Sequence, residues 1–125
     1  MDIYQQNILD YYRRPRKQGK LAETTHVGAM ANPLCGDRIE LYLEVAQDKI
    51  VSARWDGEGC VLSLVAADMM AEDLEGKALE ELAGIDKNWI LKKLGVKPSP
   101  SRQKCAFLSL EALDRAILNI NHDSL

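Results

Sequence analysis

Apolar residues recur at helical spacing in several stretches of the chain. In residues 4–12, aromatic and aliphatic side chains lie at i, i+4, i+7 and i+8, which predicts an amphipathic helix that ends before Pro15. Gly76 is placed to stop a second helix, and Asp86 and Gly95 are placed to begin and end a later one. The predicted helices cover residues 4–12, 60–74, 79–82, 87–94 and 105–120, and an extended, proline-containing linker covers residues 97–101.

Alternation of apolar and polar residues predicts strands in the middle of the chain. Over residues 38–45 every second residue is aliphatic, and in the next run Val51, Ala53 and Trp55 alternate with polar side chains. A polar turn separates these two runs, so they are expected to form an antiparallel hairpin. Residues 24–30 are a candidate for another strand. The order of elements predicts an α+β fold in which a small three-stranded antiparallel sheet packs against several helices.

Composition and charge narrow the range of functions. The 125 residues, 46% of them hydrophobic, fit one globular domain over residues 1–125. A formal net charge of −3 is untypical of nucleic-acid binders, and no apolar run is long enough to cross a bilayer. The first residues also lack the basic start and the apolar stretch of a secretory signal. A cytoplasmic protein with no nucleic-acid or membrane partner is therefore expected.

The cysteines are the candidates for chemistry. Three is an odd number, which argues against a disulfide framework and leaves buried structural thiols, a reactive nucleophile or a metal site. Cys35 stands just before the clearest strand, and an extended backbone there would point Cys35 and Asp37 to the same side. Cys60 and Cys105 are each predicted to open a helix, whose N-terminus favours a thiolate over a thiol.

A shared metal site is one interpretation of this arrangement. The cysteines lie 25 and 45 residues apart, unlike the close pairs of a zinc finger, so the fold would have to bring them together. Three thiolates and the Asp37 carboxylate carry more negative charge than a divalent ion neutralises. Arg38, Arg102 and Lys104 stand close in sequence to these residues and are expected to offset the remainder. From the residues alone, a shared site and separate roles for the cysteines both stay open.

Three segments, each with one cysteine, carry a resemblance to a known family. They are Asn32-Pro33-Leu34-Cys35-Gly36-Asp37-Arg38-Ile39, Gly57-Glu58-Gly59-Cys60 and Arg102-Gln103-Lys104-Cys105-Ala106. In this order they resemble the cysteine motifs of the U-type iron–sulfur scaffold family, which comprises IscU, SufU and the N-terminal domain of NifU. Residues 11–16 are similar to a Tyr-Tyr…Pro-Arg pattern of the same family, and the likeness covers roughly residues 3–120.

The resemblance implies a scaffold that accepts persulfide sulfur from a cysteine desulfurase. Such a protein builds or relays a [2Fe–2S] cluster for apo iron–sulfur acceptor proteins. A second copy of the chain, in a homo-oligomer, is a further candidate partner. By matching motif positions, Cys35, Asp37, Cys60 and Cys105 would ligate the iron of the cluster, or Zn²⁺ in a SufU-type sulfurtransferase. The sulfur acceptor would be Cys35 in a SufU-like mechanism and Cys105 in an IscU-like one.

Several features bear on the choice between these branches. Lys104 stands where IscU has a histidine before its third cysteine, and Arg102 and the Gly-Glu-Gly-Cys segment are similar to SufU. The chain lacks the insertion common in SufU between the second and third cysteines, and residues 97–100 do not reproduce the chaperone-recognition segment of IscU. The chain therefore resembles an intermediate that leans towards SufU. A domain in which zinc is merely structural is a third interpretation, of a different class.

Overall fold

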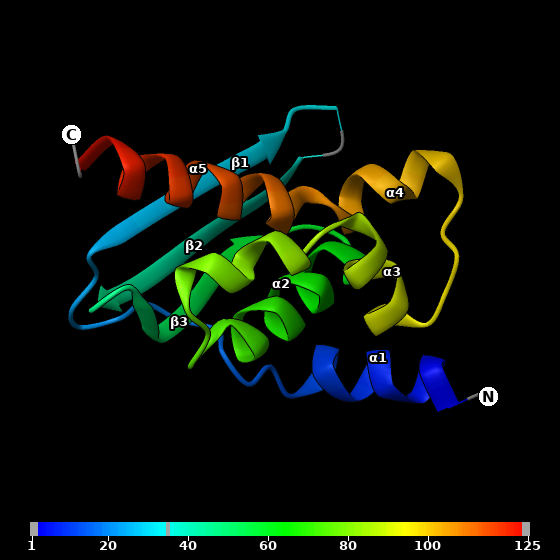
Figure 1. Cartoon of the computed structure of the whole chain (residues 1–125). Coiled ribbons are helices and arrows are strands. Elements are labelled where there is room, and N and C mark those ends of the chain that lie inside the picture. The colour runs from blue at the N-terminus through cyan, green and yellow to red at the C-terminus, as the bar shows by residue number, and fades with distance from the viewer. Residues whose placement is uncertain (1–2, 35, 124–125) are drawn as a thin grey trace.

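The strand with the clearest alternation in the sequence forms the centre of a three-stranded sheet. The computed structural model describes residues 3–34 and 36–123. Strands β1 (His26–Asn32), β2 (Asp37–Ala46) and β3 (Lys49–Glu58) are antiparallel and lie in the order β1-β2-β3 (Figure 1). The helices are α1 (Ile3–Arg13), α2 (Val61–Leu74), the 3₁₀ helix η1 (Leu79–Gly84), α3 (Lys87–Leu94), α4 (Pro100–Ala106) and α5 (Leu108–Asp123). The predicted α+β fold is confirmed.

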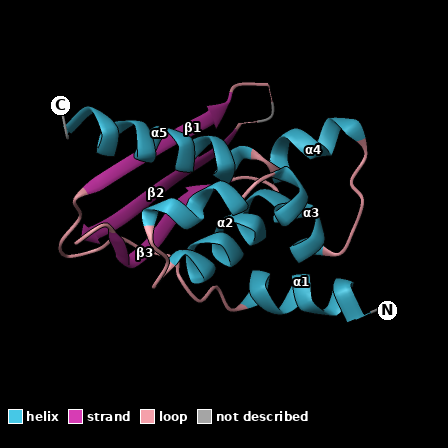
Figure 2. Cartoon of the chain, in the orientation of Figure 1, coloured by secondary structure: helices cyan, strands magenta, loops and turns pink. Residues whose placement is uncertain are grey.

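One face of the sheet packs against helices. In β2, Ile39, Leu41 and Leu43 are fully buried, whereas polar side chains occupy the alternate positions. Helix α5 contacts β1 and β2 and helix α2 contacts β3, so the two helices together cover this face (Figure 2). The contact depends on Gly28, because a Cβ atom there would lie 1.9 Å from the carbonyl oxygen of Ala112 in α5. The sequence pattern did not indicate this close approach of helix and strand.

The start of β3 departs from the predicted alternation. The register shifts between Glu44 and Val45, which leaves Val51 as an extra residue in a β-bulge. As a result Ile50 is fully buried and Val51, predicted to share a face with Ala53, is 50% exposed. That part of the prediction was wrong because a bulge moves the residues before it to the opposite face of the strand.

Local capping signals predicted several helix ends correctly. The Asp86 side chain accepts a hydrogen bond from the backbone N–H of Trp89 at 2.9 Å, and Gly95 ends α3 in the left-handed conformation with φ 69°. Gly76, with φ 89°, follows the end of α2. Among the described residues, no helix has the length and hydropathy needed to span a membrane.

The C-terminal third of the chain differs from the prediction. Residues 97–101 were expected to be a linker, but Pro100 occupies the first turn of α4 after the N-cap residue Ser99. Proline is favoured there because its missing N–H would have had no partner within the helix. Phe107 then separates α4 from α5. Cys105 therefore lies near the C-terminal end of a short helix and does not open the long one.

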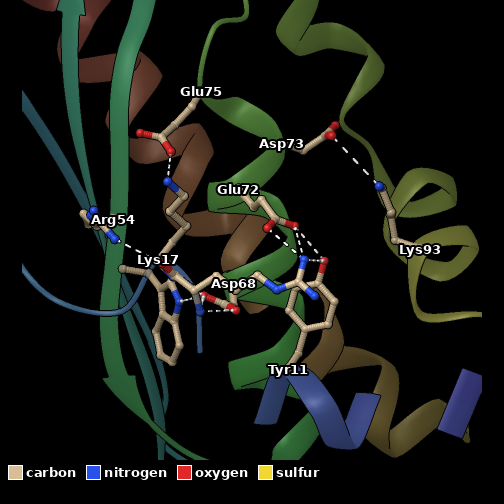
Figure 3. Close-up of polar contacts among 10 residues, drawn as sticks. Tyr11, Lys17, Arg54, Asp68, Glu72, Asp73, Glu75 and Lys93 are labelled. Atoms are coloured by element: carbon tan, nitrogen blue, oxygen red, sulfur yellow. Dashed lines mark hydrogen bonds and ion pairs between the residues drawn. The ribbon is translucent and has the colours of Figure 1, made fainter. Parts of the chain in front are cut away.

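A buried carboxylate in α2 holds the segment after α1 against the sheet (Figure 3). Asp68 is 1% exposed. It accepts hydrogen bonds from the backbone N–H groups of Arg16 at 2.9 Å and Lys17 at 2.7 Å, and from Trp55 Nε1 at 2.9 Å. The Asp68 side chain thus connects α2 with β3 and with the segment that follows α1. Glu72, one turn further along α2, forms an ion pair with Arg16 at 3.0 Å.

Candidate metal centre

Three potential metal ligands converge at one end of the molecule, each from a different element. Asp37 is the first residue of β2, Cys60 is the N-cap residue of α2, and Cys105 lies near the end of α4. One ligand atom from each residue lies within 4.8 Å of the other two. Asp37 is 3% exposed and Cys105 is 8% exposed, whereas Cys60 is partly exposed. The arrangement is a compact oxygen–sulfur–sulfur donor set of the kind that holds a metal ion.

The fourth predicted ligand, Cys35, lies outside the described residues. Its neighbours belong to the connection between β1 and β2, in which Pro33 and Leu34 form a turn and Gly36 has φ 76°. The backbone N–H of Gly36 donates to the carbonyl of Asn32 at 2.9 Å. The expectation that Cys35 points to the same side as Asp37 falls on a residue outside the described part of the chain. Asp37 still faces the helix-covered side, because it shares the face of Ile39 in β2.

Two glycines, Gly57 and Gly59, allow the segment before Cys60 to lie close to Asp37 and Arg38. The Asp37 Oδ1 atom accepts a hydrogen bond from the backbone N–H of Cys60 at 3.2 Å. A Cβ atom on Gly59 would lie 2.6 Å from this same Oδ1, and Gly59 has φ 153°. A Cβ atom on Gly57 would lie 2.1 Å from the carbonyl oxygen of Arg38. The Gly-Glu-Gly-Cys segment therefore has glycines where the backbone lies directly against the start of β2.

Ser63, which the sequence analysis did not select, lies among the three ligands. It is fully buried in the first turn of α2. Its Oγ donates to Asp37 Oδ2 at 2.6 Å, lies 3.1 Å from the carbonyl oxygen of Cys105 and lies 3.5 Å from Cys60 Sγ. The signal in the sequence was its position three residues after Cys60, which places both residues on one face of a helix.

The electrostatic environment of Cys105 differs from the one expected. Burial, followed by hydrogen bonds of the Cys105 thiol with Asp37, whose carboxylate accepts, and with Cys60, raises the pKa of the Cys105 thiol to about 12. The prediction that a helix N-terminus stabilises a thiolate here was wrong, because Cys105 lies near the opposite end of its helix. Without a cation Cys105 is therefore a thiol at neutral pH, and a metal ion that bound there would have to displace its proton.

Of the cations predicted to support the site, Arg102 and Lys104 are exposed, whereas Arg38 is only partly exposed. Arg38 forms ion pairs with Glu40 and, at 3.6 Å, with Glu58. It alternates with Asp37 along β2 and so lies on the other face of the sheet. Arg102 and Lys104 are exposed on α4, close in sequence to Cys105.

Comparison with known proteins gives a consistent result over nearly the whole chain. Residues 3–124 match the model of the NifU-like N terminal domain. The chain is 34% identical to the zinc-dependent sulfurtransferase SufU of Bacillus subtilis, over 92% of this chain and 89% of that protein. It is 30% identical to the iron–sulfur cluster assembly scaffold protein IscU 1 of Archaeoglobus fulgidus, over 94% of this chain and 76% of that one.

The fold is similar to that of a solved structure titled as a putative iron–sulfur cluster assembly scaffold protein. FiSufU of the thermophile Fervidobacterium islandicum superposes with a TM-score of 0.77 at 26% sequence identity, covering 94% of this chain and 96% of the other. The similarity therefore includes both the sheet and the helices that carry Asp37, Cys60 and Cys105.

Proposed function

The chain belongs to the family of NifU-like N-terminal domains, and from this premise we propose that it is an iron–sulfur cluster assembly scaffold that accepts persulfide sulfur from a cysteine desulfurase. It builds or relays a [2Fe–2S] cluster, its cargo, for apo iron–sulfur acceptor proteins. The observation that carries the proposal is the convergence of a carboxylate and two thiols, from three separate elements, within 4.8 Å.

The proposed ligands are Cys35, Asp37, Cys60 and Cys105. Thiolates are soft donors that suit the iron of a cluster or Zn²⁺, whereas the carboxylate of Asp37 is a harder donor that exchanges more readily. A scaffold must release what it assembles, and one exchangeable ligand among thiolates serves that purpose. We assign this role to Asp37.

The sulfur acceptor is a cysteine of this site, either Cys35 or Cys105. The thiol gives up its proton and its sulfur attacks the outer sulfur of the desulfurase persulfide. A new S–S bond forms on this chain, and the desulfurase sulfur leaves as a thiolate that takes up a proton. The sulfur keeps its oxidation state through the exchange, so the step needs no external oxidant or reductant.

A second candidate function is that of a zinc-dependent sulfur acceptor that activates its desulfurase without holding a cluster. The 34% identity to the zinc-dependent sulfurtransferase SufU favours it. A donor set of three cysteines and one aspartate also suits the four-coordinate geometry of zinc, in which the ion holds the thiolates until one is needed.

Anaerobic reconstitution separates the two functions. We expect the protein, mixed with desulfurase, cysteine and Fe²⁺, to develop the visible absorption of a [2Fe–2S] cluster and to pass it to an apo-ferredoxin. Tight binding of one Zn²⁺ with faster desulfurase turnover but no cluster would select the sulfurtransferase. Failure of both readouts would refute the proposal.

Zinc removal tests whether a metal is merely structural. The hydrophobic core cluster joins the sheet with α1, α2, η1, α3, α5 and, through Ala106, the end of α4, but contains none of Asp37, Cys60 or Cys105. We therefore expect the chelator-treated protein to stay folded, with unchanged far-ultraviolet circular dichroism. Unfolding on chelation, together with no effect on a desulfurase, would indicate a structural zinc domain.

The close packing at Gly59 gives a further prediction. Gly59→Ala keeps every proposed ligand, but its Cβ would overlap the Asp37 carboxylate at 2.6 Å and must displace it. We expect zinc affinity, measured by competition with a chromophoric chelator, to fall about 10-fold, the lower end of the range for changes around a ligand. Gly76→Ala is the matched control, since Gly76 also has a positive φ, 89°, but nothing lies within 4 Å of its Cβ position. Equal zinc affinities in the two variants would contradict the prediction.

A further inference from the structure

We infer that Ser63 is a positioning residue of this site, whose hydroxyl orients the Asp37 carboxylate so that Asp37 can ligate a metal ion. The inference rests on the proposed function, because it concerns the same ligands. It adds a residue that is not itself a ligand but determines how one ligand is presented.

Ser63 is connected to all three converging ligands. It follows Cys60 by three residues, and its Oγ lies 3.5 Å from Cys60 Sγ. Across the interface with β2, the same Oγ donates to Asp37 Oδ2 at 2.6 Å, and towards α4 it lies 3.1 Å from the Cys105 carbonyl oxygen. A single fully buried side chain thus contacts residues from each of the three elements that form the site.

The hydroxyl has one proton and two oxygen acceptors within reach. The carboxylate is the closer acceptor, at 2.6 Å against 3.1 Å, and it carries the charge. The proton therefore points to Asp37, because hydrogen bonds to an ionised acceptor are the stronger ones. The Cys105 carbonyl is left with the weaker share of this hydrogen bond.

These contacts, together with the hydrogen bond from the Cys105 thiol, hold the orientation of the carboxylate. Asp37 Oδ2 receives the Ser63 hydroxyl, and Asp37 Oδ1 receives the backbone N–H of Cys60 at 3.2 Å. With a donor on each oxygen the plane of the carboxylate is held, and each oxygen keeps lone-pair capacity for a metal ion. Hydrogen-bond partners of this kind around a ligand commonly change metal affinity by about 10- to 100-fold when they are removed.

Ser109 provides a matched control within the same chain. It is also a fully buried serine in a helix, but its Oγ has no hydrogen-bond partner among the described residues. Ser109→Ala and Ser63→Ala therefore delete the same atom at equal burial. We expect Ser109→Ala to leave zinc affinity unchanged and to stabilise the protein slightly, because a buried hydroxyl without a partner is unfavourable.

The experiment measures zinc affinity by chelator competition and the absorption spectrum of the Co²⁺-substituted protein. Ser63→Ala is expected to weaken zinc binding about 10- to 100-fold and to change the Co²⁺ ligand-field bands in the direction seen for Asp37→Ala. The double variant Ser63→Ala/Asp37→Ala is expected to bind zinc as Asp37→Ala does, because Ser63 acts through Asp37. If Ser63 had a merely structural role, Ser63→Ala would lower zinc affinity by the same factor in the wild-type protein and in Asp37→Ala.

Two outcomes overturn the inference. One is unchanged zinc affinity in Ser63→Ala while the wild-type protein binds zinc; the other is an undiminished effect of Ser63→Ala when Asp37 is already absent. If Ser63→Ala does not fold, the pair Ser63→Thr and Ser63→Val replaces it. Threonine and valine have the same shape as each other, but only threonine keeps the hydroxyl. Equal zinc affinity in that pair would also overturn it. Absence of zinc, cobalt and cluster binding in the wild type would instead refute the proposed function and the inference with it.

Discussion

Replacement of Cys105 by serine is expected to lower zinc affinity by at least about 100-fold, because loss of a ligand should exceed the 10- to 100-fold cost of losing a partner around one. Cys105 is one of three groups whose ligand atoms lie within 4.8 Å of one another. Serine keeps the size of the side chain but offers a neutral hydroxyl, a poor ligand for Zn²⁺ or cluster iron. Cys60→Ser should behave in the same way, and neither variant should assemble a cluster on reconstitution.

Stability measurements control for a folding defect in these variants. Cys105 is 8% exposed and its thiol is neutral at physiological pH, since burial and its polar neighbours raise its pKa to about 12. Exchange for a hydroxyl of nearly the same size should therefore change the stability of the metal-free protein little. Zinc binding at full strength by both Cys105→Ser and Cys60→Ser would show that the converging thiols are not the site.

Replacement of Asp68 by alanine is expected to lower the free energy of unfolding by about 3 to 5 kcal/mol. Three N–H donors from Arg16, Lys17 and Trp55 point at this carboxylate, which is 1% exposed (Figure 3). Alanine would leave these donors without an acceptor in a region from which water is largely excluded. Urea unfolding, followed by tryptophan fluorescence and circular dichroism, measures the change.

Asp73→Ala is the matched control on the same helix. Asp73 pairs with Lys77 at 3.5 Å and Lys93 at 3.9 Å, and its side chain is 33% exposed. Partly solvated ion pairs of this kind contribute between about 0 and 1 kcal/mol. If Asp68→Ala were as mild as Asp73→Ala, the buried carboxylate would not be what holds the segment after α1 in place.

Elements defined by neighbouring residues were predictable from the sequence. The alternation in β2 indicated its buried face, and Asp86 and Gly95 indicated the two ends of α3, because a cap and a helix turn involve residues only a few positions apart. The predictions failed where a local pattern allowed more than one structure. Val51 alternates correctly with Ala53, yet a bulge exposes it.

The same limit explains the error at Cys105. The apolar stripe after it predicted one long helix over residues 105–120 that begins at Cys105. In the structure Pro100 begins a separate short helix, and Cys105 lies near its other end. The three potential ligands converge nonetheless, because the position of the thiol depends on how α4 packs against α2 and not on which end of the helix carries it.

The sequence by itself determined which residues are the candidates for the chemistry: three cysteines and an aspartate, in motifs whose order and spacing are similar to a family of scaffold proteins. Only the tertiary structure decided that Asp37, Cys60 and Cys105 meet, that Ser63 lies among them and that Asp68 anchors a distant segment. The physical reason is the separation along the chain of the residues that interact. Capping and periodicity depend on residues within a turn or two, whereas a contact between residues tens of positions apart depends on how whole helices and strands pack.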